Sequence, residues 1–585
     1  MTPVWSRWKP RLLDTLGAYT AGDFVHDLIA GLTVGLVALP LAMAFGIASG
    51  TTPQAGIYTA IVGGFLVSLL GGSKYQIGGP TGAFVVVVAA IISEHGMSGL
   101  FMVTMMAGAI LLFLGMSGLG TAVKFIPRPI VIGFTNGIAV LIISTQIKDF
   151  LGLRLAEVPS EFIARMRAYA DAIGTFDGPS LAVGVTSLMI ILFSPRVFRR
   201  VPGQIVALLA ATAAAAAFAL PVETIGSRFG GIPSGLPAFQ VPQFRADLIL
   251  PLLPSALTVA ILAAVESLLS AVVADSMSGD RHNSNAELVA QGVANLVVPL
   301  VGGIPVTGAI ARTATNYRSG ARTPVAGLVH ALTLLAVVVA LAPLARFVPM
   351  ATLGAVLFVV AYNMGEWREI PDILRLDVAD ISVWLITFAL TVVADLTIAV
   401  EVGMALAALL YIYRVSETTT VSLVSKDYIE RGRAHTLQDK EVPDYVSIVR
   451  IHGPFLFGTT DKLAEATADL SQFAPIVVLR LRNMTAMDAT GLHALEQFAD
   501  RLQKSQRTLL LCGAPQQPRK MLARAEFLQH IGEDNICPHI NAALSRAALI
   551  HRKTVKRSSS SRRSTSTATP SARATGSPPD RTPPT

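Results

Sequence analysis

Apolar runs long enough to cross a lipid bilayer recur along most of this chain of 585 residues. A helix needs roughly 20 apolar residues to span the hydrocarbon core. The runs include Leu28–Ala48, Ile130–Thr145, Leu181–Phe193, Leu248–Ala274 and Val325–Leu341. Charged residues make up only 14% of the chain, against roughly 25% in typical soluble domains. A soluble protein cannot bury so many apolar helices, so the sequence predicts a polytopic α-helical membrane protein.

We expect fourteen membrane segments and infer their orientation from the charges of the loops. The segments begin near residues 26, 55, 80, 99, 129, 179, 202, 248, 284, 306, 324, 347, 379 and 397. Basic residues gather in the even-numbered connections, at Lys74, Arg128, Arg196 and Arg318 for example. Because basic loops stay on the cytoplasmic side, both termini are expected in the cytoplasm and the chain in the cell (inner) membrane.

Two of the fourteen segments are short and interrupted by Gly and Pro, and they resemble one another. They follow the stretches Gly78–Phe84 and Gly302–Ile310, which share a Thr-Gly-Ala sequence at an offset of about 225 residues. Leu32–Val34 and Leu257–Val259 repeat Leu-Thr-Val at nearly the same offset. A duplicated unit of seven segments would place its two copies in opposite orientations, so we expect a 7+7 inverted repeat of the kind found in secondary transporters.

The pattern changes after Arg414, where β-rich runs alternate with helical stretches over about 110 residues. This alternation predicts a small α/β domain. The expected divisions are an interfacial N-terminal segment at 1–22, a transport domain at 23–415, a linker at 416–440, the α/β domain at 441–550 and a disordered basic tail rich in Ser, Thr and Pro at 551–585. The net charge of +8 comes largely from this tail, so it does not indicate a nucleic-acid partner.

Glu266 is an isolated acid in the middle of an apolar segment, the run Leu248–Ala274. A carboxyl group at the bilayer centre costs about 2.5–3.5 kcal/mol on insertion scales and therefore faces protein or water. We interpret Glu266 as a proton-accepting or cation-binding group that couples transport. The alternative is a polar contact between helices without a role in transport.

The two interrupted segments supply a second candidate feature. A helix that starts within the membrane leaves backbone N–H groups unpaired and directs its positive dipole end into the protein, so two such ends form an anion site. The expected lining is Thr81, Gly82, Ala83 and Phe84 from one segment, and Thr307, Gly308, Ala309 and Ile310 from the other. Arg312 would add a cation beside them. Alternatively, the Gly and Pro residues only bend two helices, and Arg312 extends toward the membrane surface.

Other chemistry finds little support in the sequence. No His or Cys spacing fits a metal site, and neither a phosphate-binding loop nor a Gly-x-Ser-x-Gly motif occurs. We therefore expect no enzyme activity, no cofactor and no bound metal.

Several motifs resemble those of the SulP family of sulfate permeases. The resemblance runs from about residue 10 to 550 and is most specific at Asn285–Asn295, Gly302–Arg312 and Gly320–Pro324. A second stretch is Leu39–Phe45, which leads into Pro53–Tyr58. The C-terminal domain resembles a STAS domain, with Met487–Leu492 at the loop where related domains are phosphorylated.

This resemblance implies core and gate subdomains, a homodimer and a substrate bound among segments one, three, eight and ten. The positions that match the binding site of the family are Phe45, Phe84, Glu266, Ser270, Gly308, Ala309, Ile310 and Arg312. Ile310 replaces a Thr of a sodium-coupled bicarbonate carrier, and Glu266 replaces its Asp, so a sodium ion would lose an oxygen ligand. Proton coupling through Glu266 is therefore preferred to sodium coupling. Thr490 matches the regulatory Ser or Thr of STAS domains, although a Thr at a helix start is also an ordinary N-cap.

The leading hypothesis is secondary transport of sulfate, bicarbonate or a C4-dicarboxylate by elevator-like alternating access. The partners would be the anion, protons, membrane lipid, a second copy of the chain and a cytoplasmic regulator of the STAS domain. An uncoupled anion channel and an anion exchanger regulated by the STAS domain remain as alternatives. A further alternative is a sensor whose membrane part only reports to that domain.

Overall fold

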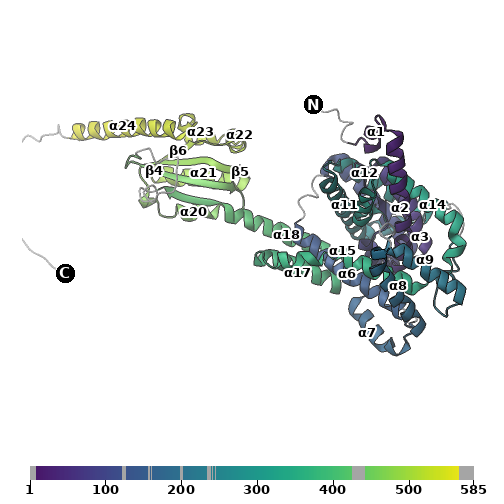
Figure 1. Cartoon of the computed structure of the whole chain (residues 1–585). Helices are drawn as coiled ribbons and strands as arrows, with labels where there is room; N and C mark the ends of the chain where they lie inside the picture. Colours follow the sequence, from purple (N-terminus) through teal and green to yellow (C-terminus); the bar gives the residue numbers. More distant parts are fainter. Residues whose placement is uncertain are drawn as a thin grey trace, which may run out of the picture. The chain divides into compact units, whose positions relative to one another are not determined.

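A computed structural model describes residues 8–120, 127–155, 158–159, 161–197, 202–232, 239, 241–243, 245–394, 396–424 and 442–565. The chain divides into two compact units, Met1–Ala407 and Ala408–Thr585. The first unit is a bundle of helices and the second is built around a β-sheet (Figure 1).

The first unit contains the membrane-length helices. Its α-helices are α1 (Arg11–Leu16), α2 (Ala21–Ala48), α3 (Pro53–Tyr58), α4 (Gly64–Leu70), α5 (Val85–Ser117), α6 (Arg128–Leu151), α7 (Phe162–Ala172), α8 (Gly178–Val197), α9 (Gly203–Phe218), α10 (Ile225–Phe229), α11 (Ile249–Ser278), α12 (Ser284–Val297), α13 (Ile310–Arg318), α14 (Val325–Ala345), α15 (Met350–Met364), α16 (Ile370–Ile373), α17 (Val378–Val393) and the start of α18 (Leu396–Thr418). A π-helical stretch, Thr59–Gly63, joins α3 to α4.

Six helical stretches among the described residues are long and apolar enough to cross a membrane, and a bent helix pair would make a seventh. These six are Ala21–Ala48, Pro53–Leu70, Gly82–Ser117, Arg128–Leu151, Ala246–Ser278 and Val325–Ala345. The stretch Gly82–Ser117 changes direction at Gly96, whose φ of 67° interrupts α5, between the expected segment starts at 80 and 99. The chain is thus a polytopic α-helical membrane protein, whereas the fourteen crossings and the 7+7 repeat remain predictions.

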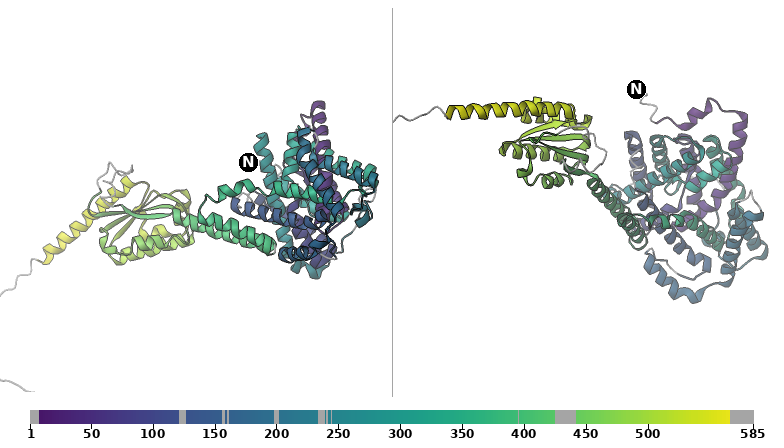
Figure 2. Two further views of the ribbon diagram at one scale, coloured as in Figure 1. Left: turned by 60° about the horizontal axis from the view of Figure 1, so that its bottom comes forward. Right: turned by 60° about the vertical axis from the view of Figure 1, so that its left-hand side comes forward.

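The helices of this unit pack in two groups. One group contains α2, α4, α5, α11, α12, α13 and α14, and the other contains α6, α8, α9, α15 and α17. Within the first group, α5 and α12 approach closely because Gly108 faces the backbone of Gly292. Small residues allow such backbone contact between membrane helices. Figure 2 shows the bundle from two further directions.

The two interrupted segments meet inside the first group. The short strands β1 (Gly78–Gly79) and β2 (Thr307–Gly308) pair in antiparallel fashion, with Gly78 opposite Gly308 and Gly79 opposite Thr307. After β1 a 3-10 turn, Gly82–Phe84, leads into α5, and after β2 the chain enters α13. The pairing therefore places the start of α5 near the start of α13.

The second unit contains a five-stranded sheet. Its strands are β3 (Thr420–Val424), β4 (Val446–Phe455), β5 (Ile476–Met487), β6 (Thr508–Cys512) and β7 (Ile536–Cys537), and its helices are α20 (Asp461–Ala466), α21 (Ala489–Lys504), α22 (Gln516–Arg524), α23 (Phe527–Ile531) and α24 (Ile540–Thr565). The strand order is β3-β4-β5-β6-β7, antiparallel at β3–β4 and parallel elsewhere.

Helices cover both faces of this sheet. One apolar cluster joins Leu479 and Leu511 to Phe498 of α21 and Leu522 of α22. The other joins Leu510 to Ala547 of α24 (Figures 1 and 2). Alternating side chains of each strand thus enter opposite cores, as the period of a strand requires.

Two expected boundaries in the C-terminal part were wrong. Strand β3 lies within residues 416–440, which we expected to be a linker, because its Thr-Val-Ser-Leu-Val sequence is β-rich and pairs with β4. Helix α24 continues to Thr565, through the first part of the tail that we expected to be disordered from residue 551. No Pro or Gly interrupts the sequence between Ile540 and Thr565, and polar side chains do not stop a helix that has already started.

Candidate functional site

A cavity of about 480 Å³ lies between the two groups of helices in the membrane unit. Its lining comes from α2, α11 and α13 on one side and from α6, α9 and α15 on the other. The predicted site residues that line it are Phe45, Thr81, Gly82, Ala83, Glu266, Ala309, Ile310 and Arg312. Residues far apart in the sequence therefore meet at one cavity.

Four predicted site residues do not line this cavity and instead support its wall. Phe84, expected in the lining, is only 1% exposed and packs within the main apolar core. The Thr307 hydroxyl lies 2.7 Å from Ser267 Oγ, which also accepts the amide of Gly308 at 2.9 Å. Ser270 Oγ donates to Thr313 Oγ1 at 3.0 Å.

Glu266 faces the cavity and is held by a residue of the first interrupted segment. Thr81 Oγ1 donates to Glu266 Oε2 at 2.8 Å. Glu266 is half-buried, and no ion pair joins it to Arg312 among the residues that the structure describes. The carboxyl group therefore keeps a face toward the cavity and an oxygen that an incoming proton can reach.

Arg312 connects the two interrupted segments. Its side chain is 3% exposed, and its Nη2 donates to the carbonyl oxygen of Pro80. The Nη1 atom lies beside Gly79, where a β-carbon would collide with it, and Nη1 has no partner within the described part of the chain. The guanidinium thus places a positive charge at the junction of β1 and the turn that follows it.

Backbone amides at the two helix starts add partial positive charge. The amides of Gly82 and Ala83 have no backbone acceptor in the described structure, and neither do those of Ile310 and Ala311. These are the amides that a helix start leaves without an intrahelical partner. All four residues line the cavity, so the site offers N–H donors and a positive dipole end to an anion.

The sequence analysis missed two residues that hold this arrangement together. The amide nitrogen of Gln76 donates to the carbonyl oxygen of Ser267 at 3.0 Å, and Ser267 Oγ accepts the amide of Gly308. Both side chains are buried, at 3% and 0% exposure. Ser267 directly follows Glu266, so a search for every polar residue in this apolar run would have found it.

Metal binding has no support in the described residues. They contain no group of three or more His, Cys, Asp or Glu side chains that could hold an ion. Ile310, which lines the cavity, offers only an aliphatic side chain and no oxygen ligand.

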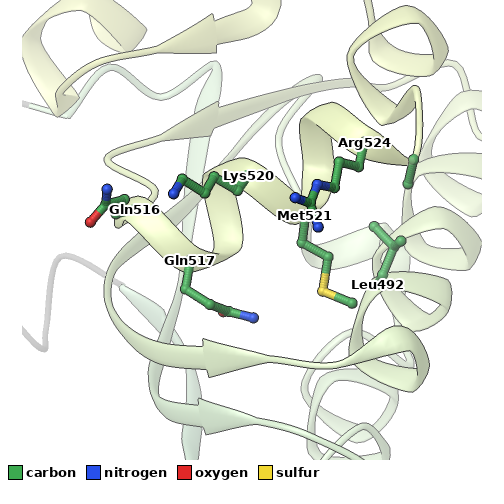
Figure 3. A pocket seen from close by; sticks show the side chains of 7 residues that line it. Leu492, Gln516, Gln517, Lys520, Met521 and Arg524 are labelled. Carbon is green, nitrogen blue, oxygen red and sulfur yellow. The ribbon is translucent and has the colours of Figure 1, made fainter. Parts of the chain in front are cut away.

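The second unit has its own hollow, of about 540 Å³, lined by α22 and by Leu492 of α21. Figure 3 shows Lys520 and Arg524 on α22 beside the apolar Met521. Thr490 lies two residues before Leu492, is exposed and is the second residue of α21. The N-cap of this helix is Asp488, which accepts the amide of Gly491 at 2.8 Å, so Thr490 is not the capping residue.

Interrupted helices that meet beside a half-buried acid, within a bundle of membrane-length helices, are an arrangement typical of the membrane proteins called secondary transporters. Comparison with known proteins specifies the family. The sulfate permease family model matches residues 24–387, and the STAS domain model matches residues 438–543. The chain belongs to the sulfate permease family.

Relatives of similar length support this assignment. The chain is 43% identical over 524 residues to the putative sulfate transporter YvdB of Bacillus subtilis, covering 89% of this chain and 97% of the relative. It is 31% identical over 539 residues to the bicarbonate transporter BicA of Picosynechococcus, covering 89% and 94%.

Solved structures agree with the fold. The transmembrane domain of a cyanobacterial BicA matches 67% of this chain and 98% of its own length, with a TM-score of 0.59 and 32% identity. The structure of SLC26A9 matches 94% of both chains with a TM-score of 0.83. Its identity of 17% makes this second likeness one of fold alone.

Proposed function

We propose that this protein is a secondary transporter that moves a small anion together with protons. The observation that carries the proposal is the convergence of Thr81, Glu266 and Arg312 with two helix starts on one cavity. N–H donors and a guanidinium favour a bound anion, whereas an ionised Glu266 disfavours it. A site with both features binds its anion best when the acid is protonated.

Because an ionised Glu266 disfavours the anion, thermodynamic linkage couples anion binding to protonation of Glu266. If protonation of Glu266 strengthens anion binding, then anion binding strengthens protonation by the same factor. A protonated Glu266 donates to Thr81 Oγ1, which leaves the threonine hydroxyl proton available to the anion. Each anion would therefore cross with a proton on Glu266, and the proton gradient would drive accumulation.

The relatives and the cavity both support a class of small anions as the substrate. One relative is described as a putative sulfate transporter and another as a bicarbonate transporter. Sulfate, bicarbonate and a C4-dicarboxylate all fit a volume of about 480 Å³. A site that rests on backbone amides selects by size and hydration, so we propose this group of anions and not one member of it.

The arrangement of the cavity suggests how the anion crosses. Glu266, Arg312 and both helix starts belong to one group of helices, and the other group closes the cavity from the opposite side. Sliding of the first group against the second would carry the whole site across the membrane, as in an elevator-like mechanism. We further propose a homodimer in the cell (inner) membrane with both termini in the cytoplasm. Proton coupling is preferred to sodium coupling, and phosphorylation of Thr490 is proposed as a regulatory input to the STAS domain.

Uptake into proteoliposomes tests the proposal. Radiolabelled sulfate, bicarbonate and fumarate would be offered at two external pH values, with and without a sodium gradient. We expect one of these anions to accumulate faster at the acidic external pH and to be indifferent to sodium. Large steady currents without acceleration by a proton gradient would identify a channel, and the absence of any uptake would favour a sensor.

A further inference from the structure

Among the described residues that line the membrane cavity, three have ionisable side chains: Glu266, Arg312 and Glu366. The first two lie on α11 and α13. Glu366 follows the end of α15 and therefore belongs to the opposite group of helices. The proposed function does not use it.

Glu366 stands at the open end of the cavity. Its side chain is exposed, whereas Arg312 is 3% exposed. The lining residues Ile130 and Gln204 belong to the first turns of α6 and α9. These helix ends adjoin loops whose basic residues assign them to the cytoplasmic side.

The backbone holds Glu366 in an unusual conformation. Its φ of 45° lies in the left-handed region, which a residue with a side chain rarely adopts. The preceding Gly365 has an ordinary φ of −69° and is small because Trp367 packs where its β-carbon would lie. The glycine of this turn is thus used for close packing, and the glutamate takes the left-handed position.

Buried contacts fix the turn that carries Glu366. Asn136 donates its side-chain amide to the carbonyl oxygen of Gly365 and accepts Trp384 Nε1 at 2.9 Å. Asn136 is fully buried on α6. The turn therefore keeps its place beside α6, and the position of the carboxyl group at the mouth is determined by the fold.

Arg128, the basic residue near this turn, forms its ion pair with an acid other than Glu366. Arg128 Nη2 lies 2.5 Å from Glu369 Oε2, and no ion pair of Glu366 is found in the described residues. Burial and the nearby Glu369 raise the pKa of Glu366, and Arg128 opposes them only in part. An anion that enters or leaves through this end thus passes two acids and one arginine among the described residues before it reaches Arg312.

We propose that Glu366 is a charge gate at the cytoplasmic mouth, which weakens anion binding from the cytoplasm and so favours release there. The proposal rests on the proposed anion transport and on the cytoplasmic assignment of this end. Because Glu366 and Arg312 lie on different helix groups, Glu366 is near the site only while the cavity is open on its side. Binding from the outside is then independent of it.

Two properties separate a charge gate from a structural role. The energy of an anion in the field of Glu366 is proportional to the charge of the anion. Because affinity depends exponentially on energy, the fold-change in affinity of a divalent anion is the square of that of a monovalent one. At a separation of roughly 10 Å in water, loss of the charge changes affinity about twofold for a monovalent anion and about fourfold for a divalent one. The effect also shrinks at high ionic strength.

The test measures the apparent KM from each face, with right-side-out and inverted membrane vesicles of cells that express the full chain. Glu366→Gln is expected to lower the cytoplasmic KM about fourfold for sulfate and about twofold for bicarbonate, and to leave the external KM unchanged. Glu366→Asp retains the charge and is expected to resemble the natural protein. Glu366→Gly removes both the charge and the left-handed strain and is expected to reproduce the effect of Gln. Glu94→Gln, which alters a 76% exposed acid on α5, is the matched control.

The outcomes distinguish the two proposals. If the natural protein transports none of sulfate, bicarbonate and fumarate, the proposed function fails and the gate with it; if fumarate is the transported anion, it replaces sulfate as the divalent probe. If the protein transports the probe anions and Glu366→Gln has an unchanged cytoplasmic KM, or changes both faces equally, the gate is overturned while the transport function stands. Equal effects on sulfate and bicarbonate overturn it as well.

Discussion

The Thr81 hydroxyl donates to the Glu266 carboxylate across 185 residues of sequence, at 2.8 Å. This hydrogen bond links the first interrupted segment to the long helix α11. It also makes the state of the acid sensitive to the position of the residues that start α5. Protonation or deprotonation of Glu266 therefore changes a hydrogen bond at the place where the anion would bind.

Replacement of Glu266 by Gln is expected to abolish acceleration of uptake by a proton gradient and to leave the fold intact. The amide has the shape of the carboxyl group and still accepts from Thr81, but it carries neither a charge nor an exchangeable acidic proton. Uptake at two external pH values and thermal unfolding in detergent provide the measurements. Proton dependence that persists in this variant would remove Glu266 from the coupling role.

Replacement of Thr81 by Val removes the hydroxyl at nearly constant volume. A hydrogen bond to a charged group contributes about 1.5–3 kcal/mol, so proton-driven uptake should fall roughly 10- to 100-fold. Thr81→Ser should retain most of the activity because it keeps the donor. The control is Thr104→Val, because the Thr104 hydroxyl donates within its own helix α5, to the Leu100 carbonyl oxygen at 2.8 Å. Equal losses in the Val and Ser variants would contradict the role of the hydroxyl.

The sequence was sufficient for the features that depend on composition and repetition. Long apolar runs identify membrane helices whatever their packing, and the repeated Thr-Gly-Ala sequence identified the two segments that pair as β1 and β2. Glu266 was found because a single acid in an apolar run has few explanations. The helix starts also lie near one another, as the interpretation of an anion site required.

Features that depend on packing could not be predicted from the sequence. Phe45 and Phe84 are both aromatic residues in apolar segments, yet only Phe45 reaches the cavity. Which of the two does so depends on the rotation of each helix against its neighbours. Likewise, Gly365 precedes the left-handed residue and does not occupy it, because the contact with Trp367 determines where the small residue must be. Nothing in a single sequence records that contact.

Gly308→Ala is expected to disrupt the pairing of β1 and β2. A β-carbon at this position would overlap the side-chain amide of Gln76 and lie 3.1 Å from the Ser267 α-carbon. Overpacking of a filled interior costs about 1–3 kcal/mol, and displacement of Gln76 would also break its bond to Ser267. We expect a lower melting temperature and little uptake. Gly22→Ala, whose new atom has no neighbour nearer than 3.7 Å, should behave like the natural protein, and normal uptake by Gly308→Ala would show that the pairing is dispensable.

The two cysteines of the second unit should be unreactive in the folded protein. Cys512 and Cys537 are buried register partners on β6 and β7, and burial raises the pKa of Cys512 to about 12. The thiolate is the reactive form, so at pH 8 about one Cys512 in 10,000 is ionised, against about one in four for a free thiol of pKa about 8.5. Because the folded-state pKa is raised, the stability that comes from burying the neutral thiol is present below about pH 8.5 and is lost as the pH rises toward 12. Labelling with a chromogenic disulfide should be slow in buffer and fast in urea, and rapid labelling of the native protein would contradict this burial.

Deletion of the chain from Lys440 onward should lower transport or delivery to the membrane and leave the anion site formed. The apolar core around Phe45 and Glu266 is built from residues of the first unit alone, and the sheet of the second unit has its own two cores. No residue that lines the membrane cavity comes from the second unit. The truncated protein should therefore bind the transported anion with the natural affinity and preference, as measured by competition against the labelled anion in detergent. A folded truncation with altered selectivity would mean that the STAS domain shapes the site itself, because a change in rate or delivery alone does not alter which anion binds.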